Sequence, residues 1–133
     1  MPHHGRVTFN ELNTWKPQAA MDYYRAVFGW EFDETQAAGT DQASPYYVAK
    51  KDGEMVAGIF ALRSPDFDGM TDHWFTYLGV DDLDAAIEAS NAAGGQVIRQ
   101  PFDIPNFGRM AVVKGATGAA QAFFQPAAQD GAA

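Results

Sequence analysis

The sequence predicts an α+β fold in which the order strand–helix–strand–strand–strand occurs twice. Two segments show helical periodicity and end in glycine, and strand-like segments precede and follow each of them. One offset relates the two segments, because Gly29 and Gly95 lie 66 positions apart, as do Leu12 and Leu78. A repeated offset together with a repeated element order indicates two modules of similar structure.

The first helix is expected over residues 17–30. Pro17 suits the first turn, where its missing N–H would have no partner, and Gly29 is a natural end. Apolar side chains recur between these two residues at helical spacing, namely Ala20, Tyr24, Val27 and Phe28.

The second helix is expected over residues 82–93. Either Asp81 or Asp82 can cap its start, and the pair Gly94-Gly95 ends it. The stripe expected to be buried consists of Leu83, Ala86, Ile87 and Ser90.

Strand-like segments surround both helices. The expected strands are residues 7–14, 30–33, 45–51, 54–62, 73–80, 96–99, 109–114 and 119–125. Asp52-Gly53 fits a two-residue hairpin turn. The prediction is therefore a single domain over residues 1–133, made of a module at 7–62 and a module at 73–126, with 127–133 as a flexible tail.

Composition excludes several classes of function. Nine Lys and Arg against 17 Asp and Glu give a net charge of -8, which argues against binding a nucleic acid backbone or an anionic membrane. No apolar run is long enough to span a membrane. The absence of cysteine excludes disulfides, thiolate nucleophiles and cysteine-ligated metals. A soluble, cytoplasmic protein is expected.

Three segments carry a resemblance to a known family. They are FNELNTWKPQAAMDYYRAVFGWEF at 9–32, HWFTYLGVDDLDAAIEASNAAGG at 73–95 and FGRMAVVKGATGAAQAFFQP at 107–126. With the repeated module, the chain resembles the glyoxalase/bleomycin-resistance/extradiol-dioxygenase superfamily, whose fold is the vicinal oxygen chelate fold. The resemblance implies two curved mixed sheets around a cavity and, since many members pair, a homodimer.

The resemblance also implies a divalent metal held by His, Gln or Glu on the first and last strands of each module. In this sequence those positions fall at Phe9, Ala57, Phe75 and Ala122. Phenylalanine and alanine side chains cannot coordinate a metal, so no metal and no cofactor is expected at these positions. A displaced site stays open, because Glu11 and His73 each lie two residues from a ligand position and point the same way.

Glu11 is the candidate catalytic residue. A carboxylate among aromatic side chains would be partly desolvated, which raises its pKa and suits it to act as a general acid or base. The alternative is a solvated glutamate that points outward from its strand. The residues expected to bind ligand are Phe9, Asn13, Ala57, Phe75, Tyr77, Arg109, Ala122 and Phe124.

This lining suits a flat aromatic or amphipathic ligand, although the same aromatic side chains could simply fill a core. Arg109 could pair with a ligand carboxylate, or with Asp103 or another acidic group. Three functions follow. The first is a metal-free small-molecule binder, like the antibiotic-sequestering members that confer bleomycin resistance. The second is a glyoxalase-like lyase or isomerase, and the third is a structural or interaction module without ligand.

Overall fold

The computed structural model describes residues 4–36 and 45–127. It divides into two compact units, each described here by itself. The N-terminal unit comprises residues 9–75, and the composite unit joins residues 4–8 to residues 76–127. Each unit contains one helix and four strands, so the predicted α+β class and the repeated element order are confirmed. Of the predicted tail, residues 128–133 lie outside the described residues.

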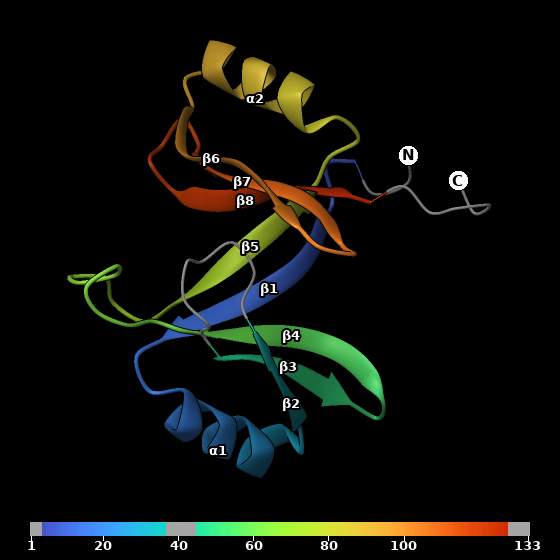
Figure 1. Cartoon of the computed structure of the whole chain (residues 1–133), viewed down its shortest axis with the longest axis vertical. Coiled ribbons are helices and arrows are strands. Elements are labelled where there is room, and N and C mark those ends of the chain that lie inside the picture. The colour runs from blue at the N-terminus through green and yellow to red at the C-terminus, as the bar shows by residue number, and fades with distance from the viewer. Residues whose placement is uncertain (1–3, 37–44, 128–133) are drawn as a thin grey trace. The chain divides into compact units, whose positions relative to one another are not determined.

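The N-terminal unit is built from the larger part of β1 (Val7–Thr14), together with α1 (Pro17–Phe28), β2 (Glu31–Gln36), β3 (Pro45–Lys51) and β4 (Glu54–Ala61). Its strand order is β2-β3-β4-β1 (Figure 1). The first two neighbouring pairs are antiparallel, whereas β1 and β4 are parallel. The expected turn between β3 and β4 forms at Asp52 and Gly53, which both have positive φ angles of 53° and 83°.

Helix α1 forms as the sequence predicts. Pro17 occupies its first turn, and Gly29 ends it in the left-handed conformation, donating its N–H to the carbonyl of Arg25. The buried face of the helix places Met21 against Leu12 of β1 and Ile59 of β4. These three buried side chains form a hydrophobic cluster in the core of the N-terminal unit.

The composite unit is built from the larger part of β5 (His73–Gly79), together with α2 (Leu83–Ala92), β6 (Gln96–Ile104), β7 (Gly108–Lys114) and β8 (Ala120–Pro126). Its strand order is β5-β8-β7-β6, with β5 and β8 parallel. Asp82 caps α2 by accepting the N–H of Ala85. Leu83 is fully buried against Val113 and Ala111, so α2 covers this sheet (Figure 1).

Residues 4–8 belong to the composite unit. Gly5 donates its N–H to the carbonyl of Gly79 at 2.8 Å, and the N–H of Gly79 donates to the carbonyl of Arg6 at 2.9 Å. The chain passes from one unit to the other within β1, after Thr8, and within β5, after Phe75. Neither helix in the described part of the chain is long and apolar enough to cross a membrane.

Strand β6 runs further than the expected 96–99. It continues to Ile104, through Pro101, with register shifts against β7 on either side of Arg99. Because β6 lies at the edge of its sheet, the missing N–H of Pro101 costs no ladder bond to a second neighbour. Strand β6 therefore extends beyond its expected end at residue 99.

Candidate functional site

The polar residues of β1 lie on the sheet face opposite α1. Leu12 packs toward Met21 of the helix, and alternation along the strand directs Glu11 and Asn13 to the other face with Phe9. Glu11 is 6% exposed and Asn13 is 8% exposed. Glu11 is thus buried and not solvated, whereas its role as an acid or base stays a prediction.

Strand register places Gly58 beside Glu11. The Cα of Glu11 pairs with that of Gly58 in the parallel β1–β4 ladder. A Cβ at Gly58 would lie 1.9 Å from the hydroxyl oxygen of Tyr46 and 3.1 Å from Cζ of Phe9. The ring of Tyr46 therefore crosses β4 over Gly58. Sequence reasoning missed Tyr46, and its available signal was a glycine inside a strand, which often marks such a close approach.

Substituting Gly58 by alanine is expected to displace the Tyr46 side chain and to destabilise the fold by about 1 kcal/mol, because the new Cβ meets the far end of a rotatable side chain. Urea denaturation measures this cost. In a Tyr46→Ala background the same substitution should cost less, since the obstructing hydroxyl is gone and only the contact with Cζ of Phe9 at 3.1 Å remains. An equal cost in both backgrounds would place Tyr46 elsewhere.

In the N-terminal unit, the residue of β4 that pairs with Glu11 is Gly58, whereas Ala57 was expected at the family's metal position on this strand. Ala57 is buried and alternates with Gly58 onto the α1 side, where Ile59 also lies. In the composite unit, Tyr77 pairs with Ala122 as Glu11 pairs with Gly58. The structural counterpart of Ala122 is therefore Gly58, which likewise has no metal-binding atom in its side chain.

The residues at the family's metal positions do not fit a divalent metal. Phe9 and Phe75 offer only rings. The nearby His73 has its Nδ1 2.7 Å from the carbonyl oxygen of Thr71. Within residues 4–36 and 45–127, no three His, Asp or Glu side chains gather so that they could hold a metal. No step of a mechanism is therefore assigned to a metal at these positions.

Three expected ligand-binding residues share one face of the composite sheet. Register pairs Tyr77 with Ala122 and Gly79 with Phe124, and the rings of Tyr77 and Phe124 lie 6.5 Å apart. Arg109, the fourth expected residue of this unit, pairs with Gln125 and so alternates to the α2 side.

Arg109 is engaged in ion pairs. Its guanidinium lies 3.7 Å from Asp103 and 3.9 Å from Asp84 of α2. The sequence left open whether this arginine pairs with a ligand, with Asp103 or with another acidic group, and in the structure it pairs with Asp103 and Asp84. The contacts are partly exposed, so each contributes little to stability.

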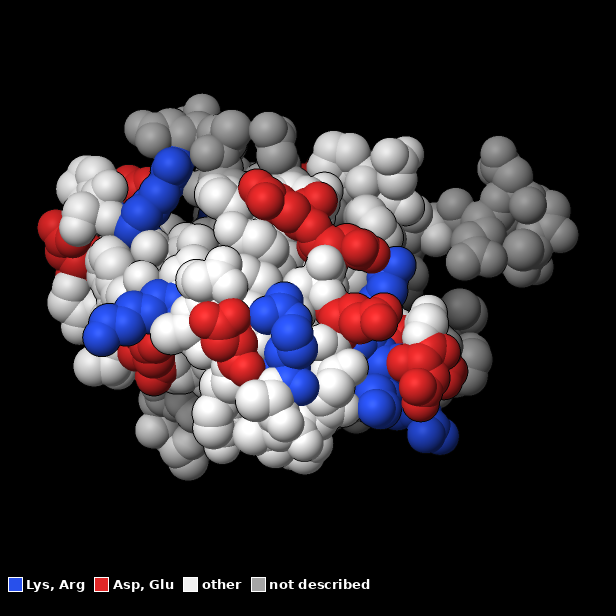
Figure 2. Space-filling model, turned by 90° about the horizontal axis from the view of Figure 1, so that it is seen from below, with Lys and Arg blue, Asp and Glu red and all other residues white. Residues whose placement is uncertain are grey.

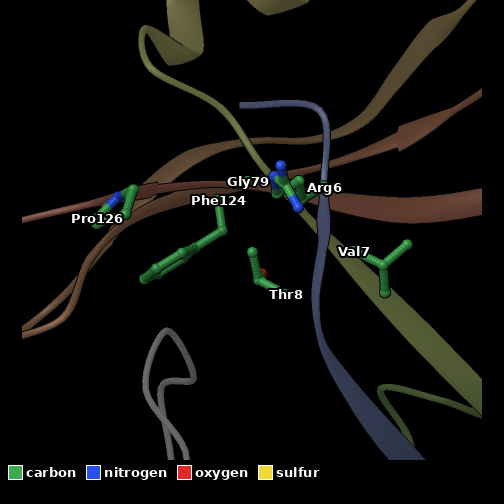
Figure 3. Close-up of a pocket in the computed structure, with 6 residues that line it drawn as sticks. All are labelled: Arg6, Val7, Thr8, Gly79, Phe124 and Pro126. Atoms are coloured by element: carbon green, nitrogen blue, oxygen red, sulfur yellow. The ribbon is translucent and has the colours of Figure 1, made fainter. Parts of the chain in front are cut away.

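A pocket of about 370 Å³ opens beside Phe124 in the composite unit (Figure 3). Its lining residues are Arg6, Val7, Thr8, Gly79, Phe124 and Pro126. Phe124 alone among them was expected from the sequence. The other lining residues were not predicted. Residues 6–8 lie at the pocket because the backbone beside them pairs with Gly79, and a long-range pairing of this kind has no local sequence pattern.

An aromatic cluster surrounds the end of α1, and it consists of Tyr23, Tyr24, Phe28, Trp30, Phe32 and Trp74. Tyr24 stacks on Trp30 with centroids 4.9 Å apart and meets Trp74 edge-on at 5.8 Å. Tyr23 and Phe28 remain more than half exposed at 59% and 52%. These rings lie on the α1 side of the sheet, away from the face of Glu11.

Asp72, in the segment before β5, accepts hydrogen bonds from residues at the end of β1. The hydroxyl of Thr14 donates to its carboxylate at 2.5 Å, and the backbone N–H of Trp15 donates at 3.1 Å. The Thr14 hydrogen bond is the main cause that lowers the pKa of Asp72 below its ordinary value of 3.8.

On the face shown in Figure 2, acidic and basic side chains are interspersed, and neither sign of charge dominates.

An Asp72→Asn variant is expected to lose about 1 kcal/mol of stability at pH 7, a value reduced for solvent exposure. Since the folded pKa is lowered, the charged form stabilises the fold above pH 3.8, and this contribution disappears as the pH falls through the folded pKa. Urea denaturation from pH 7 to pH 2.5 should show the two proteins converging at the acid end. Asp66→Asn, a change to an exposed carboxylate in the same segment, is the control. A gap that persists at pH 2.5 would contradict this account.

Comparison with known proteins gives the family. Residues 6–123 match the pattern of the Glyoxalase/Bleomycin resistance protein/Dioxygenase superfamily. CFP32 of Mycobacterium bovis, named as a candidate glyoxylase, is 38% identical over 125 residues, covering 94% of this chain and 46% of that protein. The anthracycline biosynthesis protein DnrV of Streptomyces peucetius is 33% identical over 139 residues, covering 96% and 50%. The chain spans about half the length of these curated relatives.

Solved structures agree on the fold. Methylmalonyl-CoA epimerase of Mycobacterium tuberculosis matches with a TM-score of 0.65 at 16% identity, covering 96% of this chain and 91% of that one. The Mn(II)-bound glyoxalase of Novosphingobium aromaticivorans matches with a TM-score of 0.60 at 16% identity, covering 92% and 39%. On the pattern match and the curated relatives together, the chain belongs to the Glyoxalase/Bleomycin resistance protein/Dioxygenase superfamily.

Proposed function

We propose that this chain binds a small aromatic or amphipathic organic molecule, without a divalent metal at the positions that the family's enzymes use. The observation that carries the proposal is the chemistry of these positions, where Phe9, Phe75 and Ala122 have no donor atom. The fourth position is Ala57 by sequence or Gly58 by strand register, and neither side chain can bind a metal. Rings and small apolar side chains favour a ligand held by burial and stacking.

Each unit offers its own candidate surface for this ligand. In the N-terminal unit, Phe9 and Asn13 share the face of Glu11. In the composite unit, Tyr77 and Phe124 share a face beside the pocket. Because two relatives are named for anthracycline biosynthesis, an anthracycline is among the first compounds to titrate.

Metal analysis by elemental mass spectrometry tests the metal-free part of the proposal. Tag-free protein is incubated with Zn, Ni, Mn and Fe in turn and then dialysed. We expect far less than one metal ion per chain to remain. A Glu11→Gln/His73→Ala double variant serves as the control for the displaced site.

Each other outcome has a distinct meaning. Near-stoichiometric retention that the double variant abolishes would replace this proposal with a displaced metal site at Glu11 and His73. Retention that the double variant leaves unchanged would show that the metal positions lie elsewhere in the chain. Small-molecule binding is judged separately, by thermal shift against an aromatic compound library, and a complete absence of shifts would count against it.

A second candidate function is that of a lyase or isomerase with Glu11 as acid or base. The burial of Glu11, at 6% exposed, favours it, because a carboxylate shielded from water is a common acid–base group in enzyme sites. The assay uses methylmalonyl-CoA and the hemithioacetal of methylglyoxal and glutathione. Turnover that Glu11→Gln abolishes, with unchanged urea stability, would establish the enzyme.

The third candidate function is that of a structural or interaction module without ligand. A homodimer is proposed both for this module and for the small-molecule binder. The exposed rings of Tyr23 and Phe28 in the aromatic cluster favour an interaction surface. Light scattering coupled to gel filtration measures the oligomeric state. A cytoplasmic location stays a prediction, to be tested by fractionation of the cells that produce the protein.

A further inference from the structure

Within the described residues Arg6 has no acidic partner, in contrast to several other cations of this acidic chain. Arg25 pairs with Asp22 at 3.1 Å, and Lys50 pairs with Asp33 at 2.7 Å. Within residues 4–36 and 45–127, no ion pair involves the guanidinium of Arg6. Its side chain instead lines the pocket beside Phe124 (Figure 3).

The other walls of this pocket are apolar or neutral. Phe124 and Pro126 offer a ring and an aliphatic surface, and Gly79 has no side chain. Thr8 lends a hydroxyl, which donates to the carbonyl of Tyr77 at 3.4 Å and keeps its oxygen lone pairs. No acidic residue lines the pocket, so nothing in the lining opposes the charge of an anion.

The size of the pocket limits the ligand. At about 370 Å³ it lies near the lower end of the roughly 300–1,000 Å³ that small-molecule sites occupy. One or two fused rings fit this volume. A guanidinium prefers a carboxylate, which it can meet with two parallel hydrogen bonds.

We propose that the pocket lined by Arg6 and Phe124 binds a small aromatic carboxylate. The ring of the ligand packs against Phe124, and its carboxylate accepts hydrogen bonds from the guanidinium of Arg6. This inference rests on the proposed small-molecule binding and adds the charge and size of the ligand to it.

A pair of matched probes tests the assignment. 2-Naphthoate and 2-naphthamide have the same ring system, and only the first carries a charge. Both titrations are followed by NMR, at low and at high salt. At low salt, naphthoate should bind about fivefold to tenfold more tightly than naphthamide. This preference should shrink at high salt, because salt screens the attraction between the carboxylate and the guanidinium. Resonances of Thr8 and Gly79 should shift in both titrations.

Two variants assign the preference to its residue. Arg6→Met should bring the affinity for naphthoate down to that for naphthamide. Arg25→Met is the matched control, because it removes a guanidinium that pairs with Asp22 outside the pocket, and it should change neither affinity.

Equal affinities for the two probes in the unchanged protein would overturn the carboxylate assignment. If Phe124→Ala then weakened both probes, small-molecule binding in the pocket would stand without the charge. A naphthoate preference that survives Arg6→Met would also overturn the assignment. Binding of neither probe would remove the pocket as the site, and the compound library would still decide the proposed function.

Discussion

Ile59→Ala is expected to reduce the free energy of unfolding by about 2–5 kcal/mol. Ile59 is completely buried between Leu12 of β1 and Met21 of α1, and its removal leaves a cavity among side chains fixed on three elements. The substitution loses the free energy gained by transferring the removed atoms from water to the core, and it also loses their packing contacts. Urea denaturation at pH 7, followed by circular dichroism, measures the loss.

Two further variants calibrate this value. Ile59→Val removes one methylene group at the same place and should cost about 0.5–1.5 kcal/mol. Ile98→Ala makes the same chemical change on β6 at a residue that is 50% exposed, and it should cost much less. If Ile59→Ala and Ile98→Ala were equally mild, Ile59 would not lie in the core.

Gly108→Ala is expected to cost more than about 2 kcal/mol, through backbone strain and steric conflict together. The residue begins β7 with a φ angle of +151°, which L side chains rarely adopt. A Cβ there would lie 2.1 Å from the carbonyl oxygen of Gln125 and 2.9 Å from the backbone nitrogen of Ala127. Both obstacles are backbone atoms of β8 and its continuation, so neither can rotate away.

Gly118→Ala separates the two causes. Gly118 also has a positive φ angle, +93°, but a Cβ there meets nothing within 4 Å. Its replacement should cost only the conformational strain, about 1–2 kcal/mol. Denaturation curves of both variants give the difference, which measures the conflict with β8. Equal losses at the two glycines would mean that β8 yields to the new side chain.

The helices could be predicted because their signals are local. Pro17 and Gly29 fix the two ends of α1 through their own backbone preferences, and Asp82 caps α2 by a bond to a residue three positions away. Strand register has no such local signal. The irregularity between Ala49 and Lys50 shifts the β3–β4 pairing, and a shift of one residue moves every side chain to the opposite face of the sheet.

The candidate site followed the same division. Alternation along β1 was enough to put Glu11 and Asn13 on one face, and burial of Glu11 accords with the expected desolvation. Whether Ala57 or Gly58 faces Glu11 depended on register and could not be read from composition. Arg6 and Tyr46 emerged only from the structure, because distant backbone pairing in one case and a missing Cβ in the other bring them into place.

The discontinuous composition of the composite unit sets an order of events during protein synthesis. The pocket needs residues 6–8, then Gly79 and finally Phe124 and Pro126. At about 5–20 residues per second, a ribosome makes Phe124 roughly 6–24 seconds after Arg6. Residues 9–75 are all available well before that moment and can close their own sheet first. The pocket is therefore among the last features to form. Residues 6–8 lack their partners in the pocket until Phe124 and Pro126 have been synthesised.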